Sequence, residues 1–174
     1  QEFMQSKRLK EHINFLVRHG SMYLVYNNNL LMHSCVPCDK NGNFIEMQIG
    51  DKVYAGKDLY DKCNRVVLSA YNNRDKYSTD FMWYLWCGKD SPVFDKNKMA
   101  TFERYFLKEK ELHKETKGYY YALRNDEKIC DMILDEFGVV GPHRHIINGH
   151  VPVKTIKGEN PIKNSKMMLI DGGF

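Results

Sequence analysis

The chain has 174 residues, enough for one domain with a sizeable core, and its 43% apolar and 28% charged content is typical of a globular protein rather than a disordered one. No apolar run approaches the roughly 20 residues of a membrane span. The formal net charge of +4 suits an anionic substrate or weak nucleic-acid contact and selects neither. The odd number of cysteines, without framework spacing, predicts free thiols and a cytoplasmic protein.

The first part of the chain predicts a helix followed by a hairpin. Ser6 is a candidate N-cap for an amphipathic helix over 7–19. Residues 22–26 and 30–36 are predicted strands, joined by a run of three asparagines that favours a turn. Another short strand is expected within 44–49.

The rest of the chain mixes helices and short strands, which indicates an α/β fold. Residues 80–86 are apolar on most faces, so we expect them to be buried. Residues 88–118 are charged and irregular, and Asn125 is a candidate cap for the last long helix. The predicted elements are helices at 56–70 and 126–137 and strands at 145–148 and 167–170.

Two histidines occur in matching contexts. His33 and His150 each follow an apolar strand and precede a short turn that leads to Val-Pro. The ends of strands are positions where rigid scaffolds present ligands, and neutral imidazole is a common metal ligand. The pattern therefore predicts a metal site, while two hydrogen-bonded structural histidines remain the alternative.

Two further segments carry cations. Residues 141–145 contain a His-x-His that is either a metal ligand pair or a solvated turn, and Arg144 within it is a candidate phosphate contact. Residues 83–117 combine tryptophans, lysines, Arg104 and Lys114, which can bind phosphate or single-stranded nucleic acid. Interleaved glutamates offset much of that charge, so a solvated surface is the competing interpretation.

Several runs of sequence resemble the class III fructose-1,6-bisphosphatases over nearly the whole chain. Their first histidine motif is similar to LMHSCVP, and their tryptophan motif is similar to WYLWCGKDSPVF. The most specific block begins with NGHVPVK, which contains His150. The runs are residues 31–37, 83–94, 101–106, 113–115, 148–154, 158–163 and 170–174.

The resemblance implies part of a calcineurin-like metallophosphoesterase domain, an α-β-β-α sandwich with mixed sheets and a two-metal site. Residues 1–174 would be the C-terminal portion of that domain, truncated at both ends. His33 and His150 would share one of the two metals, which the resemblance implies to be manganese. By ligand type alone, zinc or iron would serve equally well.

The superfamily's other ligand motifs, Asp-x-His, Gly-Asp-x-x-Asp-x-Gly and Gly-Asn-His, do not occur in this sequence. Gly50-Asp51 resembles the start of one but lacks the second aspartate, and His150 is not followed by a second histidine. Two imidazoles cannot hold two metals. We therefore expect the chain alone to be inactive without the missing N-terminal part of its domain.

The resemblance implies a bacterial enzyme of gluconeogenesis that hydrolyses fructose 1,6-bisphosphate through metal-activated water. Arg104, Lys114 and Arg144 are the candidate phosphate contacts. The alternatives are a protein or dinucleotide phosphatase, or a basic nucleic-acid-binding module that uses residues 83–117. The sequence leaves the oligomeric state open.

Overall fold

A computed structural model describes residues 2–171, apart from the side chain of Met4. The last three residues of the IDGGF run lie outside this range. The elements are α1 (Glu2–Gln5), α2 (Lys7–His19), β1 (Tyr23–Tyr26), β2 (Asn29–Met32), β3 (Met47–Ile49), β4 (Lys52–Tyr54), α3 (Gly56–Asn73), α4 (Lys76–Cys87), α5 (Thr101–Phe106), the 3-10 helix η1 (Lys110–His113), α6 (Tyr120–Leu123), α7 (Glu127–Glu136), β5 (His145–Asn148), the 3-10 helix η2 (Thr155–Lys157) and β6 (Met167–Leu169).

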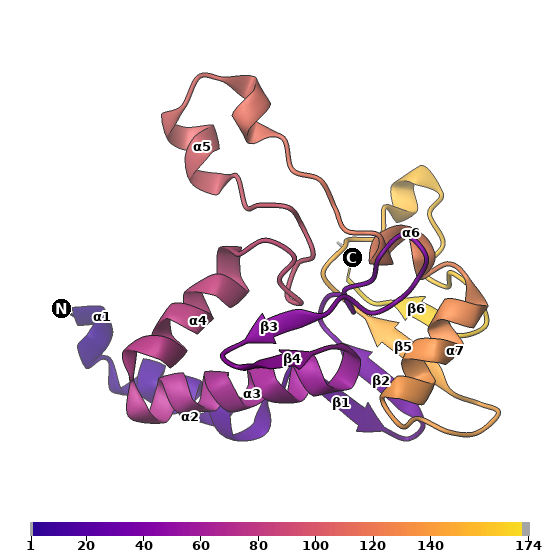
Figure 1. The fold of residues 1–174 in the computed structure, drawn as a ribbon, viewed down its shortest axis with the longest axis horizontal. Helices are drawn as coiled ribbons and strands as arrows, with labels where there is room; N and C mark the ends of the chain where they lie inside the picture. The colour runs from indigo at the N-terminus through magenta and orange to yellow at the C-terminus, as the bar shows by residue number, and fades with distance from the viewer. Residues whose placement is uncertain (1, 172–174) are drawn as a thin grey trace.

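The main sheet has four strands in the order β1-β2-β5-β6 (Figure 1). The predicted hairpin forms the antiparallel β1-β2 pair, whereas β2, β5 and β6 run parallel. The α/β prediction is therefore confirmed, with a mixed sheet. Because β2 and β5 are parallel neighbours, their carboxyl ends meet at one edge, and Met32 lies opposite Asn148.

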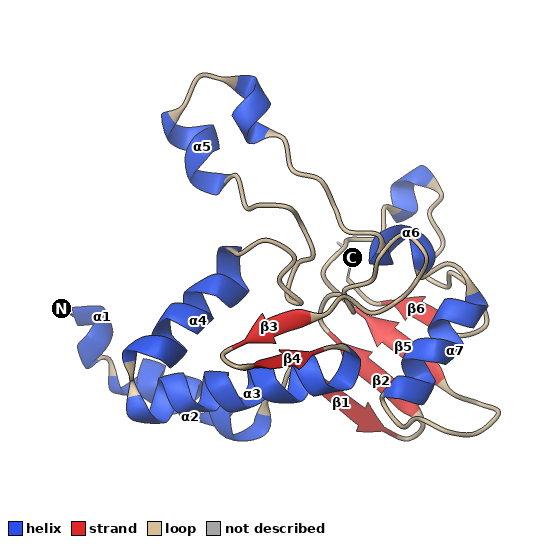
Figure 2. Cartoon of the chain, in the orientation of Figure 1, coloured by secondary structure: helices blue, strands red, loops and turns tan. Residues whose placement is uncertain are grey.

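One face of this sheet carries the core. Leu30, Ile146 and Met167 are buried against α3, α6 and α7, which cover that side (Figure 2). The other face presents a row of apolar residues that the strand register aligns. Leu24 and Met168 at its two ends are exposed, and the two residues between them, Leu31 and Ile147, are half-buried. Among the described residues, no second layer covers this row.

The local predictions succeed where a side chain closes a helix. Ser6 accepts a hydrogen bond from the Leu9 amide at 3.2 Å, as the sequence predicts. At α7 the cap is Asp126 rather than Asn125, because the Asp126 carboxylate accepts from the Lys128 amide at 2.9 Å. The predicted strand over 30–36 is too long, since β2 ends at Met32.

The prediction that residues 80–86 are buried is wrong. In α4 one side packs on α3, but Trp83 is 58% exposed on the other side. The segment after α4 leaves the body as an arm, residues 96–117, which carries α5 and η1 (Figure 1). None of the described residues in these two short helices is buried.

No helix within residues 2–171 combines the length and apolar character needed to cross a bilayer.

Candidate metal centre

The structure brings the two predicted histidines together at the carboxyl edge of the sheet. His33 directly follows β2, and His150 follows β5 by two residues. His150 Nδ1 lies 3.1 Å from His33 Nε2, and the two rings are nearly perpendicular at 81°. Two imidazoles that are 117 positions apart in the sequence therefore share a hydrogen bond.

The backbone after β5 turns sharply to make this contact. His150 has a φ of +68°, in the left-handed region that residues with a side chain seldom adopt. The Gly149 amide donates to the Met32 carbonyl at 3.2 Å, and a Cβ at position 149 would lie 3.1 Å from the His33 carbonyl oxygen. Glycine at this position allows the two strand ends to approach closely.

Asn148 ties the two strand ends together, and the sequence reasoning missed it. Its buried Nδ2 donates toward the carbonyls of Met32 and His33, each at 3.4 Å, and to that of Ser34. These bonds explain why β2 ends early: the carbonyls of residues 32–34 turn toward a side chain. A polar residue at an inward position of an otherwise apolar strand was the available signal.

His150 is partly buried and lies near positively charged side chains. The Tyr121 ring stacks 6.5 Å from the His150 ring, and Lys117 Nζ lies 5.3 Å from the Tyr121 centroid. Burial lowers the pKa of His150 first, and the charges of His33, Lys96 and Lys117 lower it further, while Asp171 opposes them. The lowered pKa favours the neutral imidazole, whose lone pair can bind a metal.

The two imidazoles have the spacing to bind one divalent ion, but they supply only part of its ligand set. Two imidazole nitrogens that bind one ion at about 2.0–2.1 Å would lie roughly 3 Å apart, close to the spacing of this pair. Within residues 2–171, no cluster of three or more His, Cys, Asp or Glu side chains has metal-binding geometry. The pair thus supplies two ligands of a site that needs more.

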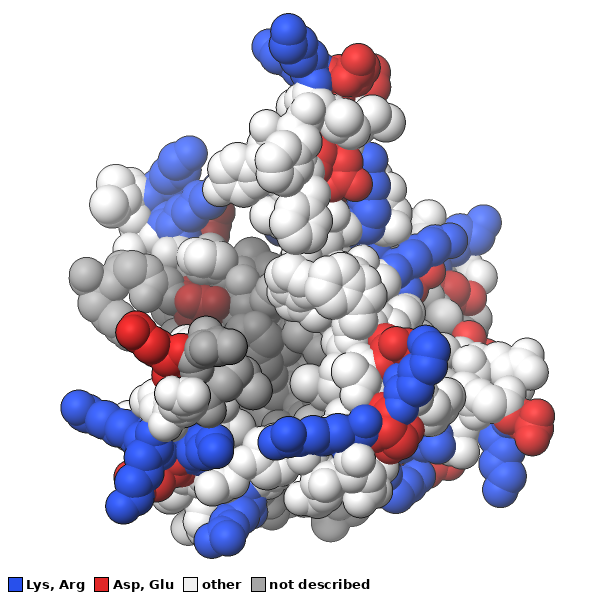
Figure 3. Space-filling model, turned by 90° about the vertical axis from the view of Figure 1, so that its left-hand side faces the viewer, with Lys and Arg blue, Asp and Glu red and all other residues white. Residues whose placement is uncertain are grey.

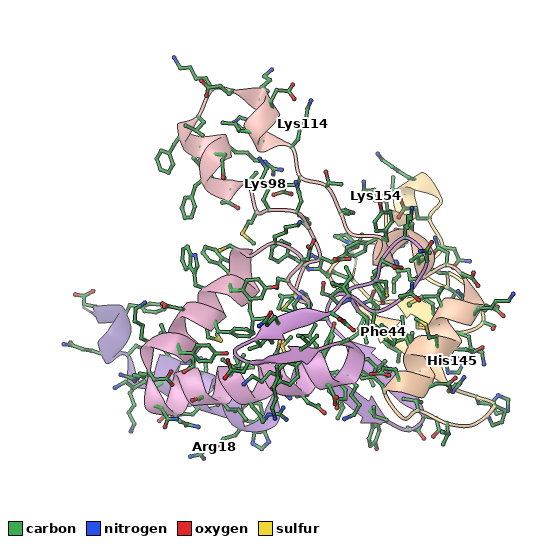
Figure 4. All side chains as sticks on the ribbon, in the orientation of Figure 1. Arg18, Phe44, Lys98, Lys114, His145 and Lys154 are labelled. Carbon is green, nitrogen blue, oxygen red and sulfur yellow. The ribbon has the colours of Figure 1, made fainter. Side chains whose placement is uncertain are left out.

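The three candidate phosphate contacts lie elsewhere. Arg144 is at the opposite end of β5, where it binds Asp131 at 2.8 Å and also Asp135. Arg104 and Lys114 belong to the arm and pair with its glutamates, at 3.4 and 2.6 Å. Figure 4 labels Lys114 near the end of the arm. The structure brings none of these three residues to the histidines, and their role stays a prediction.

The cations whose charge acts on His150, Lys96 and Lys117, stand at the two ends of the arm, where their backbones form an isolated antiparallel bridge. Lys96 pairs with Glu115 at 2.9 Å. The sequence analysis placed both within the cationic segment 83–117 but did not single them out, because only the folded arm brings its two ends together. On the face shown in Figure 3, blue and red side chains are interspersed, with no continuous basic stripe among the described residues.

Comparisons with known proteins agree with the motifs. A family model described as Firmicute fructose-1,6-bisphosphatase matches residues 1–174. Class 3 fructose-1,6-bisphosphatases from Phocaeicola vulgatus and Bacteroides fragilis are 61% and 58% identical, and one from Clostridium botulinum is 51% identical. Each alignment covers 99% of this chain but 27% of the relative, so the chain spans about a quarter of their length. No solved structure matches it.

Proposed function

The chain belongs to the Firmicute fructose-1,6-bisphosphatase family, and we propose that the protein of which it is part hydrolyses fructose 1,6-bisphosphate to fructose 6-phosphate and phosphate. The names of its relatives support the substrate. The observation that carries the chemistry is the contact between His33 and His150 at the sheet edge. We place the reaction in gluconeogenesis. We also place the protein in the cytoplasm of a bacterium, and the five free cysteines support this compartment.

We propose that His33 and His150 are ligands of one ion of a dinuclear centre, with manganese as the metal. Bound divalent ions supply an activated water and offset charge on the phosphate. The chain's own contribution is to hold two imidazole nitrogens 3.1 Å apart. Lys117 and Lys96 add positive charge beside them, which favours a phosphate group at the same edge.

We propose that residues 1–174 are the C-terminal portion of one catalytic domain with a calcineurin-like α-β-β-α sandwich. The apolar row on the open sheet face supports this, because such a face needs a covering layer. A groove of about 400 Å³ runs along that face and reaches His33; its lining includes Leu24, Leu31 and Ile147. The missing part of the domain would supply the second sheet and the remaining ligands, so the chain alone would be inactive.

Metal analysis and phosphate release by the full-length protein test the proposal. His33→Ala and His150→Ala should each lose metal and lower turnover of fructose 1,6-bisphosphate at least about 100-fold, more than the loss of a group that only orients a ligand. His145→Ala is the matched control, because His145 is exposed at the other end of β5. Normal metal content and turnover in both variants would overturn the proposal.

Phosphopeptide and dinucleotide substrates, assayed in parallel, distinguish the other phosphatase activities. A nucleic-acid-binding module predicts salt-dependent binding that survives both histidine substitutions.

A further inference from the structure

Arg124 is a buried cation without a carboxylate partner among residues 2–171. Its side chain is 5% exposed, and its Nε has no hydrogen-bond partner there. Nη1 donates to Asn148 Oδ1 at 3.1 Å, and the guanidinium carbon lies 5.3 Å from the Tyr121 ring centroid. Burying an unpaired charge is costly, so a hydrophobic residue would serve stability better here.

Asn148, which accepts the hydrogen bond from Arg124, connects this arginine to both histidines. Asn148 Oδ1 also accepts from the Tyr120 hydroxyl at 3.3 Å, and Nδ2 donates to the backbone that carries His33. A charged donor on the amide oxygen polarises the amide group and strengthens its N–H donors. The same residue stands two positions before His150, at the end of β5.

We propose that Arg124 and Asn148 are positioning residues that fix the spacing of His33 and His150 for a shared metal ion. The inference rests on the proposed function, since it concerns the same centre. The backbone ladder of β2 ends at Met32, so His33 has no strand partner to orient it. The polarised amide of Asn148 orients the backbone of His33 instead, by donating to its carbonyl. Groups that orient metal ligands in this way are typically worth 10- to 100-fold in metal affinity.

Asn148→Asp separates this role from simple packing. The substitution is isosteric and gives Arg124 the carboxylate partner it lacks. It also removes the two N–H donors and turns an anionic oxygen toward the carbonyls of residues 32–34. We expect cobalt affinity at the histidine pair to fall roughly 10- to 100-fold while the metal-free protein stays folded.

Two more variants complete the set. Tyr120→Phe removes another donor to Asn148 Oδ1 but leaves the N–H groups and the charge, so cobalt affinity should stay within about threefold. Arg124→Met removes the buried charge. It should weaken cobalt binding by about tenfold without lowering the unfolding temperature of the metal-free protein, because a hydrophobic replacement of a buried charge is often neutral or stabilising.

The measurement is a cobalt titration of the metal-free full-length protein, followed by visible absorption, with thermal unfolding of the same samples. His33→Ala identifies the cobalt that the histidine pair binds. If His33→Ala binds cobalt normally, the proposed function fails. If His33→Ala loses cobalt but Asn148→Asp and Arg124→Met bind it with wild-type affinity, the positioning role alone is wrong. Should Asn148→Asp not fold, the affinity of Arg124→Met decides.

Discussion

The histidine centre and the arm hold their side chains by different means. At the centre, strand register, the Asn148 bonds and a glycine contact fix the two imidazoles. In the arm, Tyr105 and Phe106 are 80% and 77% exposed, and α5 and η1 have no buried described residue. The difference places the groups suited to chemistry on the rigid sheet edge and leaves the arm tolerant of change.

The two regions meet at a neck formed by Asp95, Lys96, Lys117 and Gly118. The Gly118 amide donates to the Asp95 carbonyl at 2.7 Å. The Asp95 side chain is 1% exposed, and neither carboxylate oxygen has a partner within the described residues. Substitutions at this neck should therefore lower stability, as substitutions at the histidine centre would, although the neck joins the exposed arm to the body.

Gly118→Ala should give the largest loss of stability at the neck. A Cβ there would overlap the Asp95 carboxylate, and overpacking of this kind costs about 2–3 kcal/mol. Asp95→Ala removes the overlapping group, so the double variant should lose less stability than the two single effects combined. Chemical denaturation of all three proteins measures this coupling. Simple additivity would mean that the two residues do not touch.

The Asp95 carboxyl should make stability depend on pH. Burial raises its pKa to about 6, with a further contribution from Asp90, whereas the unfolded pKa is about 3.9. The folded state therefore keeps a proton that the unfolded state releases. Stability contributed by this group is full below about pH 4 and falls by roughly 2–3 kcal/mol as pH rises through 6. In Asp95→Asn, unfolding midpoints of the metal-free protein should lose this decline; a profile parallel to wild type contradicts it.

Lys117, at the end of the arm near the histidines, should differ from a lysine farther out on the arm in its effect on KM for the substrate. Lys117→Met removes a charge that acts on His150, and we expect KM for fructose 1,6-bisphosphate to rise about tenfold, or about 1.4 kcal/mol. Lys98→Met is the matched control, since Lys98 Nζ donates to the Leu112 carbonyl within the arm, and the KM of this variant should not change. If both substitutions raised KM equally, the lysine near the histidines would have no special role in substrate binding.

Tyr105→Ser should have the smallest effect, because the side chain is 80% exposed on the arm. We expect the free energy of unfolding to change by less than about 0.5 kcal/mol. A larger loss in the full-length protein would show that another surface covers the arm there.

The sequence predicted best what local chemistry decides. The Ser6 cap, the asparagine turn and the helix over 126–137 depend on neighbours a few residues away, and all three appear in the structure. The buried environment expected for residues 80–86 failed because apolar content alone does not identify the covered side of a helix. The β4 strand also escaped prediction, since its three residues carry too short a pattern.

The site was predicted only in part, for a related reason. Matching strand-end contexts identified His33 and His150, because strand ends can be recognised locally. The cations could not be assigned, since their distance from the histidines depends on where the arm leaves the body. Asn148 and Arg124 are hydrogen-bonded across 24 positions, and no local pattern marks that contact.

The parallel pairing of β2 with β5 also has a consequence for the order in which the protein is made. His33 leaves the ribosome 117 positions before its partner. Until β5 emerges, β2 has only the β1 hairpin beside it, and neither the Asn148 clamp nor the second imidazole exists. Closing so long a loop is slow, so the histidine pair forms late in folding. A nascent chain interrupted before residue 150 therefore carries one imidazole of the pair and cannot yet hold a metal between the two.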